Sequence, residues 1–496
     1  MLVRLTVILA ALVAVVATPL LLRTDRDVSE ARSNARLVIV SPHNQTIRRA
    51  FSQAFAAHLH AKRGLDVYVD WRVPGGTSEV RRLLDGEFAT AAENRHEGTP
   101  LDLLFGGSSY DFDRQASDGH LTPTRIFQDQ PDLFQSAILP ATHTGETYYH
   151  PRGLWLGACL STMGIVANTD TCRRLGLPHP PAQWADLADP RLSGMVALAD
   201  PTKSGSVNKA FELIVQEQMQ AAIGTLSAGE AGYTRDLDAA KASGWLRGIQ
   251  IIQRIGANSR YFTESAVQIP LDVAQGNAAA GLCIDYYART YSDLHLRADG
   301  SSRIVFTTPR RGTSVSVDGV AILRGAPHRE LAEEFIAFLL SKEGQRVWSL
   351  RPGQPGAPAT ALRRLPVRRD LYTPQETTAF SDPDARPYGP DATFSYQPEL
   401  TGAAFNSLAL IIRAMCLDSH DELRAAWQAL IEHRFPPRAT AAFEDVSMVG
   451  YGSACGNIRR ALESPDRLDA VTLQRELLVA FRRNYRLATH LARAGL

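Results

Sequence analysis

Apolar runs and helical patterns alternate along the chain after residue 35. Residues 37–40 form a short β-branched run that predicts a strand, and apolar residues then recur at helical spacing over residues 47–59. The alternating residues 65–73 and the apolar run 101–105 predict two further strands, and a helical pattern lies between them. Strands that alternate with helices indicate an α/β unit with a parallel sheet and right-handed crossovers.

The same alternation resumes in a second unit. Residues 157–168 form a longer apolar segment, which predicts a strand that crosses from the first unit into the second. A buried strand is expected at residues 279–284, and strands at residues 304–307 and 316–323 are expected to return to the first unit. We therefore expect two α/β lobes, made of residues 36–155 with 304–370 and of residues 156–303.

The last part of the chain has a different pattern. Between residues 351 and 398 it is rich in Pro, Gly and Arg and has little periodicity. Helical spacing then recurs in residues 402–417, 421–433, 456–463 and 472–494. We expect a helical C-terminal extension over residues 371–496, and it carries no recognisable chemical motif.

Length and composition fit a soluble globular protein of two or three domains. The 496 residues exceed one ordinary domain, and the 45% hydrophobic and 21% charged content is typical of globular chains. The net charge of +1 gives no indication of nucleic acid or a membrane surface as partner. No cofactor is indicated, and we expect a monomer.

Residues 1–23 form a separate segment. Arg4 precedes an apolar run over residues 5–22, and Arg23 closes it, which is the pattern of an export signal. Small residues at Val15 and Ala17 suit cleavage after Ala17, while the length also suits an uncleaved membrane anchor. Both alternatives place the protein in the periplasm or outside the cell.

The five cysteines have no CxxC or Cys/His spacing, so a zinc site is not indicated. In an oxidising compartment Cys416 and Cys455 are the first pair to test for a disulfide, since both lie in the C-terminal region. Buried apolar thiols are the alternative.

Four polar turns follow predicted strands and precede predicted helices. Free N–H groups and the helix dipole make such helix starts suited to anions, although ordinary capping uses the same residue types. If the four turns meet at one crevice, they form a site for an anionic ligand, and Lys203 either pairs with a phosphate or is solvated. The candidate binding residues in these turns are Ser41, His43, Gly76, Thr77, Ser78, Gly107, Ser108, Lys203, Ser204, Gly205 and Ser206.

The strand at residues 279–284 ends in Asp285, Tyr286 and Tyr287, which complete the candidate ligand-binding residues. On a continuing strand the two phenols would point to opposite faces, but both reach the crevice if the backbone turns there. With His43, this pair could hold ferric iron, because phenolate oxygen is a hard ligand. Asp285 could instead bind polar groups of an organic ligand.

Several motifs together resemble the extracellular solute-binding proteins of bacterial ABC importers, in the group for ferric iron, sugar phosphates and phosphonates. They are residues 41–43, 105–107, 184–190, 199–206, 281–287 and 318–321. The resemblance implies the two-lobe periplasmic-binding-protein fold, type II-like, with crossing hinge strands. It also implies capture of an anionic solute or anion-supported iron between the lobes and delivery to an ABC permease in the inner membrane.

In the ferric binders of that group, paired tyrosines, a histidine near the first strand, a carboxylate and a bound anion hold the iron. His43, Tyr286 and Tyr287 of this chain match the histidine and the two tyrosines. The carboxylate has no clear match, because Glu79 lies in a different local context. Two other classes of protein are alternatives to a solute-binding protein. A hydrolase or transferase of phosphorylated substrates would need a nucleophile with a base, yet GxSxG, HExxH and P-loop motifs are missing from the sequence. A membrane-tethered ligand-sensor domain would keep residues 1–23 attached.

Overall fold

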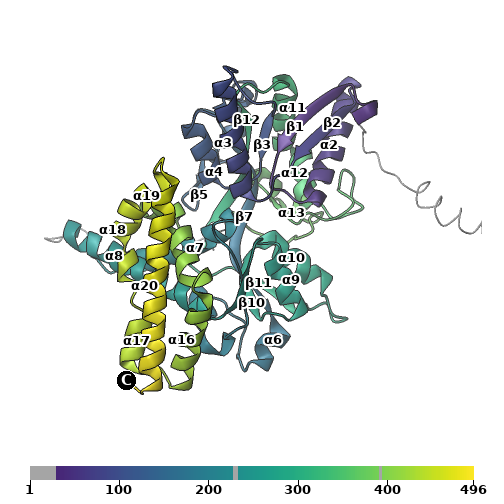
Figure 1. The fold of residues 1–496 in the computed structure, drawn as a ribbon. Helices are drawn as coiled ribbons and strands as arrows, with labels where there is room; N and C mark the ends of the chain where they lie inside the picture. The colour runs from purple at the N-terminus through teal and green to yellow at the C-terminus, as the bar shows by residue number, and fades with distance from the viewer. Residues whose placement is uncertain (1–29, 227–232, 390–393) are drawn as a thin grey trace, which may run out of the picture.

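The computed structural model describes residues 30–226, 233–389 and 394–496, so the predicted export segment lies outside the described residues. Figure 1 shows two α/β lobes one above the other, with a group of C-terminal helices along one side of the second lobe.

The first lobe is built on a mixed sheet. Strand β1 pairs in parallel with β2 and β3, and β12 joins β3 in the antiparallel sense. The apolar run that predicts β1 forms the buried part of that strand. Asn44 caps α2, because the Asn44 side chain accepts a hydrogen bond from the Ile47 N–H. The elements of this lobe are β1 Ala35–Val40, α2 Gln45–Arg63, β2 Val67–Arg72, α3 Thr77–Glu93, β3 Leu103–Phe105, α4 Ser109–Ser117, β4 Leu121–Thr122, α5 Ile126–Asp129, β12 Val315–Leu323, α11 Arg329–Leu340 and α12 Lys342–Ser349.

One long strand joins the two lobes. The first half of β7 (Leu156–Asn168) pairs with β12, and its second half pairs with β10 and β11. The change of partner falls between Thr162, opposite Val315, and Met163, opposite Ile284. This is the crossing strand that the long apolar segment predicts. The small hairpin of β5 (Thr142–His143) and β6 (Glu146–Thr147) precedes it, and β13 (Leu365–Pro366) pairs with it.

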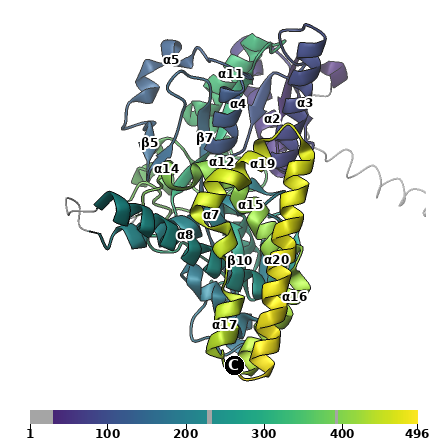
Figure 2. The same cartoon turned by 60° about the vertical axis from the view of Figure 1, so that its left-hand side comes forward.

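The second lobe has its own parallel core, in which β8 lies between β10 and β9. Two long helices, α7 and α8, pack against each other beside this sheet, as Figure 1 and Figure 2 show. Its elements are α6 Thr169–Arg174, β8 Val196–Ala199, α7 Gly205–Ile223, α8 Tyr233–Ala257, β9 Ser259–Thr263, α9 Gln268–Gln275, β10 Ala280–Ile284, α10 Asp285–Leu294 and β11 Ile304–Thr307.

The predicted return to the first lobe at residue 304 comes one strand too early. Strand β11 lies in the second lobe, where Ile304 pairs with Asn168 and Thr307 with Ile165 of β7. The chain returns with β12. Both strands are short apolar runs, and their spacing along the chain does not reveal which half of β7 each one pairs with.

The C-terminal extension is helical from residue 398 onward, later than the predicted start at 371. Among the described positions between β13 and residue 398 are one short α-helix, α13 (Pro374–Thr377), and one 3₁₀ helix, Arg369–Leu371. The helices that follow are α14 Pro398–Thr401, α15 Phe405–Ile412, α16 His420–Glu432, α17 Pro437–Phe443, α18 Tyr451–Ser453, α19 Arg459–Glu463 and α20 Arg467–Arg493.

The extension and the second lobe share one hydrophobic core. Buried residues of α7, α8 and the second sheet form a single cluster with Leu408, Trp427, Phe443 and Phe481 of the extension. The stretch Pro398–Leu417 is long and apolar enough to cross a membrane, but 72% of it is buried inside the protein, so it serves here as a core element.

All five cysteines are free thiols. The proposed Cys416–Cys455 disulfide is therefore not formed, and the alternative of buried thiols describes Cys159, Cys172, Cys283 and Cys416. Cys416 packs against Gly256 of α8: a Cβ added at that glycine would lie 2.6 Å from the Cys416 Sγ.

The close packing of α7 on α8 depends on glycine. A Cβ added at Gly244 of α8 would lie 2.5 Å from the Cα of Met219 on α7. Gly244→Val should therefore lower the free energy of unfolding by about 1–3 kcal/mol, as overpacking does. Gly86→Val is the matched control, because Gly86 is exposed on α3 with nothing within 4 Å of its added Cβ. Equal urea midpoints for the two variants would contradict this account.

Candidate functional site

A cavity of about 540 Å³ lies between the two lobes. Both lobes and the strands that join them contribute to its wall. Its charged, hydroxyl-bearing, aromatic and glycine lining residues are His43, Gly75, Gly76, Thr77, Glu79, Gly107, Ser108, Asp111, Ser161, Lys203, Ser204, Gly205, Ser206, Lys209, Glu264, Ser265, Tyr286, Tyr287, Ser316, Asp318 and Arg364.

Four helices begin at this cavity. α3 starts after Gly76, its N-cap residue, which has no side chain to cap the helix. α4 starts after Ser108, which forms a capping box with Asp111. α7 starts after Ser204, and α10 starts after Ile284. A helix start presents N–H groups and positive dipole potential, so this arrangement attracts negative charge. The polar turns predicted from the sequence thus lie around the same cavity.

The lobes touch each other at the rim of the cavity. A Cβ added at Gly205 of the second lobe would lie 2.7 Å from the Thr77 Oγ1 of the first. A Cβ added at Gly76 would lie 3.0 Å from the carbonyl oxygen of Lys203. Glycine at these two positions lets the backbones approach closely, so the structure is that of closed lobes.

Three predicted binding residues lie outside the cavity wall. Ser41 is buried beneath it, where its Oγ accepts a hydrogen bond from the His43 N–H at 3.0 Å. Ser78 is on α3 and is not one of the lining residues. Asp285 is buried behind the tyrosines, where it pairs with Arg289 and accepts the Tyr286 N–H at 2.9 Å. These side chains support the wall without forming it.

A buried charge cluster that sequence reasoning missed lies on the floor of the cavity. Arg364 is 2% exposed and donates to the Asp318 Oδ2 at 2.6 Å, and the His43 Nε2 is 3.5 Å from the same oxygen. Ser161 donates to the other Asp318 oxygen at 3.1 Å. His43, in the turn at residues 41–43, and the motif at residues 318–321 were the sequence signals near this cluster. Arg364 carried none, because its partner is 46 positions away.

Electrostatics of the cluster favour an ionised Asp318 beside a neutral His43. Burial lowers the pKa of His43 and outweighs the opposing effect of Asp318. Burial alone would raise the pKa of Asp318, but Arg364 and His43 hold it below its ordinary value. The ion pair of Asp318 with Arg364 is therefore kept near neutral pH.

Both tyrosines line the cavity because the chain turns after β10. They lie in the first turn of α10, and their ring centroids are 4.0 Å apart. The Arg364 guanidinium lies 4.5 Å from the centroid of the Tyr286 ring, which is a cation–π contact. Burial raises the pKa of both phenols, so each is harder to ionise than a free tyrosine.

The other charged side chains of the wall also have partners. Lys203 pairs with Glu264, and Glu79 pairs with Arg82. Lys209 lies 3.1 Å from both Glu146 and Glu212. With side-chain charges compensated, the helix starts provide the remaining attraction for an anion. Among described residues, one group of three His, Cys, Asp or Glu side chains has metal-ligand geometry, namely Asp85, Asp118 and His120, and none of the three lines the cavity.

Comparison with known proteins identifies the class. Residues 111–374 match the family model of the bacterial extracellular solute-binding proteins. The chain is 24% identical over 280 residues to the phosphoglycerate transport regulatory protein PgtC of Salmonella typhimurium, an alignment that covers 56% of this chain and 58% of that protein.

Two solved structures show the same fold. The periplasmic binding protein AfuA from Actinobacillus pleuropneumoniae, with fructose-6-phosphate bound, superposes with a TM-score of 0.50 and 19% identity, covering 68% of this chain and 86% of AfuA. Iron-bound HitA from Pseudomonas aeruginosa gives a TM-score of 0.50 and 19% identity, covering 76% of this chain and 99% of HitA.

The chain belongs to the family of bacterial extracellular solute-binding proteins. The predicted resemblance and the two-lobe α/β fold are confirmed, and the family is one of binding proteins.

The burial of His43 has a consequence for stability. Its lowered pKa means that the unfolded chain takes up a proton as the pH falls below about 6.5 while the folded protein does not. Stability should therefore fall with the pH from that value downward. His43→Gln should flatten this dependence between about pH 6.5 and 5, as measured by urea unfolding. The exposed His96→Gln is the control, and a slope unchanged by His43→Gln would refute the assignment.

Proposed function

We propose that the protein captures a small phosphorylated organic anion between its lobes and presents it to an ABC permease in the inner membrane. The observation that carries this proposal is the convergence of helix starts from both lobes on one closed cavity. A phosphate group accepts N–H hydrogen bonds and responds to the dipoles of several helices at once. A cavity of about 540 Å³ is in the size range of small-molecule sites.

Three features of the site favour an organic anion over ferric iron. His43 faces Asp318, which is already paired with Arg364. The Arg364 cation lies over the ring of Tyr286, where it would repel a ferric ion. Burial also raises the pKa of both phenols, so the ligand set for iron would have to be ionised at a cost.

The comparisons support this choice of ligand without deciding it. One relative is named for phosphoglycerate transport and one structural neighbour holds fructose-6-phosphate, while another neighbour holds iron. The chemistry of this cavity matches the first two.

We propose binding without catalysis. The His43 Nε2 faces the Asp318 carboxylate, and the Ser41 Oγ, below the wall, accepts the His43 backbone N–H. This geometry does not place a serine nucleophile against a histidine base. Binding would then act through lobe closure, in which the closed state is favoured because it lets both lobes contact the solute. Residues 5–22 would serve as export signal or as membrane anchor.

A ligand screen tests the proposal. Fructose 6-phosphate, 3-phosphoglycerate and inorganic phosphate are added to the purified protein, and the melting temperature is followed; we expect stabilisation by at least one phosphate ester. Ferric citrate should give no visible phenolate-to-iron band. A strong band that disappears in Tyr287→Phe, with no shift from any phosphate ester, would establish the iron alternative instead.

Closure at the rim can be tested separately. Gly205→Val places a side chain against Thr77 and should hold the lobes apart. A closure penalty of about 1–3 kcal/mol corresponds to binding weaker by about 5- to 150-fold, measured by calorimetry with the phosphate ester found in the screen. Gly86→Val should bind as the unchanged protein does. Equal affinity in both variants would mean that the solute binds without the closed rim.

A further inference from the structure

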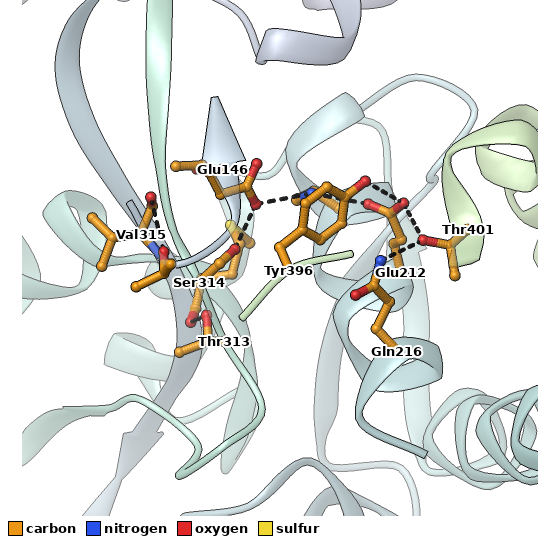
Figure 3. A network of polar contacts seen from close by, with 12 residues as sticks. Glu146, Glu212, Gln216, Thr313, Ser314, Val315, Tyr396 and Thr401 are labelled. Carbon is orange, nitrogen blue, oxygen red and sulfur yellow. Dashed lines mark hydrogen bonds and ion pairs between the residues drawn. The ribbon is translucent and has the colours of Figure 1, made fainter. Parts of the chain in front are cut away.

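The C-terminal extension is fixed to the second lobe where the solute cavity lies. Asn208 of α7 donates to the carbonyl oxygen of Phe405 at 2.8 Å, and Gln216 of α7 donates to the Thr401 Oγ1 at 2.8 Å. The Glu212 Oε1 accepts hydrogen bonds from Thr401 at 2.6 Å and from Tyr396 at 2.8 Å, as Figure 3 shows. α7 begins at the cavity, so this part of the extension moves with one wall of the site.

The same network continues to the hinge. Lys209, which lines the cavity, lies 3.2 Å from the centroid of the Tyr396 ring and bridges Glu212 to Glu146 on β6. Glu146 in turn accepts from the Ser314 Oγ at 2.6 Å, next to the start of β12 (Figure 3). The Tyr396 N–H donates to the carbonyl oxygen of Thr144 at 2.8 Å. The extension therefore reaches the hairpin beside the hinge as well as the second lobe.

A second contact joins the extension to the first lobe directly. Tyr110 lies in the first turn of α4, whose start forms part of the cavity wall. Its ring centroid is 4.5 Å from that of Phe405, and Asn406 donates to its hydroxyl at 2.8 Å. Phe405 and Asn406 are held on α7, so this contact spans the two lobes. Figure 2 shows α15 and α19 at the end of the extension nearest to the first lobe.

We infer that the C-terminal extension takes part in solute capture: Phe405 and Asn406 hold Tyr110, and through it the start of α4, in the closed position. Tyr110 is a positioning residue, because it acts on the cavity through α4. An aromatic pair and a hydrogen bond formed across the lobes in the closed state shift the equilibrium toward closure by about tenfold. This inference does not depend on which solute the cavity accepts.

A crosslink at the rim reports closure without any ligand. The Cβ built at Gly205 lies 3.8 Å from the Thr77 Cβ, which is within the roughly 3.5–4.5 Å spacing of disulfides. The double variant Thr77→Cys, Gly205→Cys is therefore oxidised in a glutathione buffer, and the rate at which the bond between positions 77 and 205 forms is followed by peptide mass spectrometry. Identifying the bond by its peptides separates it from oxidation of the half-buried Cys455.

Further substitutions in this background test the contact. Tyr110→Ala should slow the crosslink about tenfold, and Tyr110→Phe and Asn406→Ala should each slow it by a smaller factor. Tyr68→Ala, on the edge strand β2, should leave the rate unchanged. Combining Tyr110→Phe with Asn406→Ala should slow the reaction no more than either alone, because both remove the same hydrogen bond.

Unfolding midpoints identify any variant that fails to fold, and Tyr110→Phe and Asn406→Ala remain informative if Tyr110→Ala does not fold. Rates equal to that of the parent in the folded Tyr110→Ala, Tyr110→Phe and Asn406→Ala variants would overturn the inference. Additive effects of Tyr110→Phe and Asn406→Ala would overturn it too, and so would a parent that forms no crosslink.

Discussion

The backbone pairing of β7 is the constraint on which this structure depends. One continuous strand takes part in the sheets of both lobes, and its partners change between Thr162 and Met163. Each half is held by strands of its own lobe, so rotation of one lobe against the other is concentrated where the partners change. The cavity, the Asp318 cluster and the Glu146 network all lie beside this point.

The site combines cationic side chains that are paired with carboxylates and helix starts that attract anions. Arg364, Lys203 and Lys209 each have a carboxylate partner in the closed structure. Buried charges without partners would be costly, and the pairs remove that cost whether or not a solute is present. The helix starts differ from them, because their dipoles add positive potential at the cavity.

Much of this arrangement could be predicted from local sequence. Apolar periodicity identified the strands and the crossing segment, and the rule that ligands lie at the carboxyl ends of strands indicated which turns would meet. Arg364, Asp318 and Glu146 could not be found in this way, since their roles depend on contacts between distant residues. The position of β11 was wrong for a similar reason: a short apolar run does not encode its partner strand. Asp285 lies outside the cavity wall because its carboxylate pairs with Arg289 of the same helix, a contact that the strand pattern does not indicate.

The shared core of the extension and the second lobe has a consequence for biosynthesis. Buried side chains of α7 and α8, near the middle of the chain, belong to one cluster with Phe481 and Tyr485 of α20, and Gln253 of α8 donates to the Tyr485 hydroxyl at 3.1 Å. The second lobe therefore cannot complete its hydrophobic core until α20 has been synthesised. Until then a large apolar surface stays uncovered, and such surfaces favour aggregation during folding.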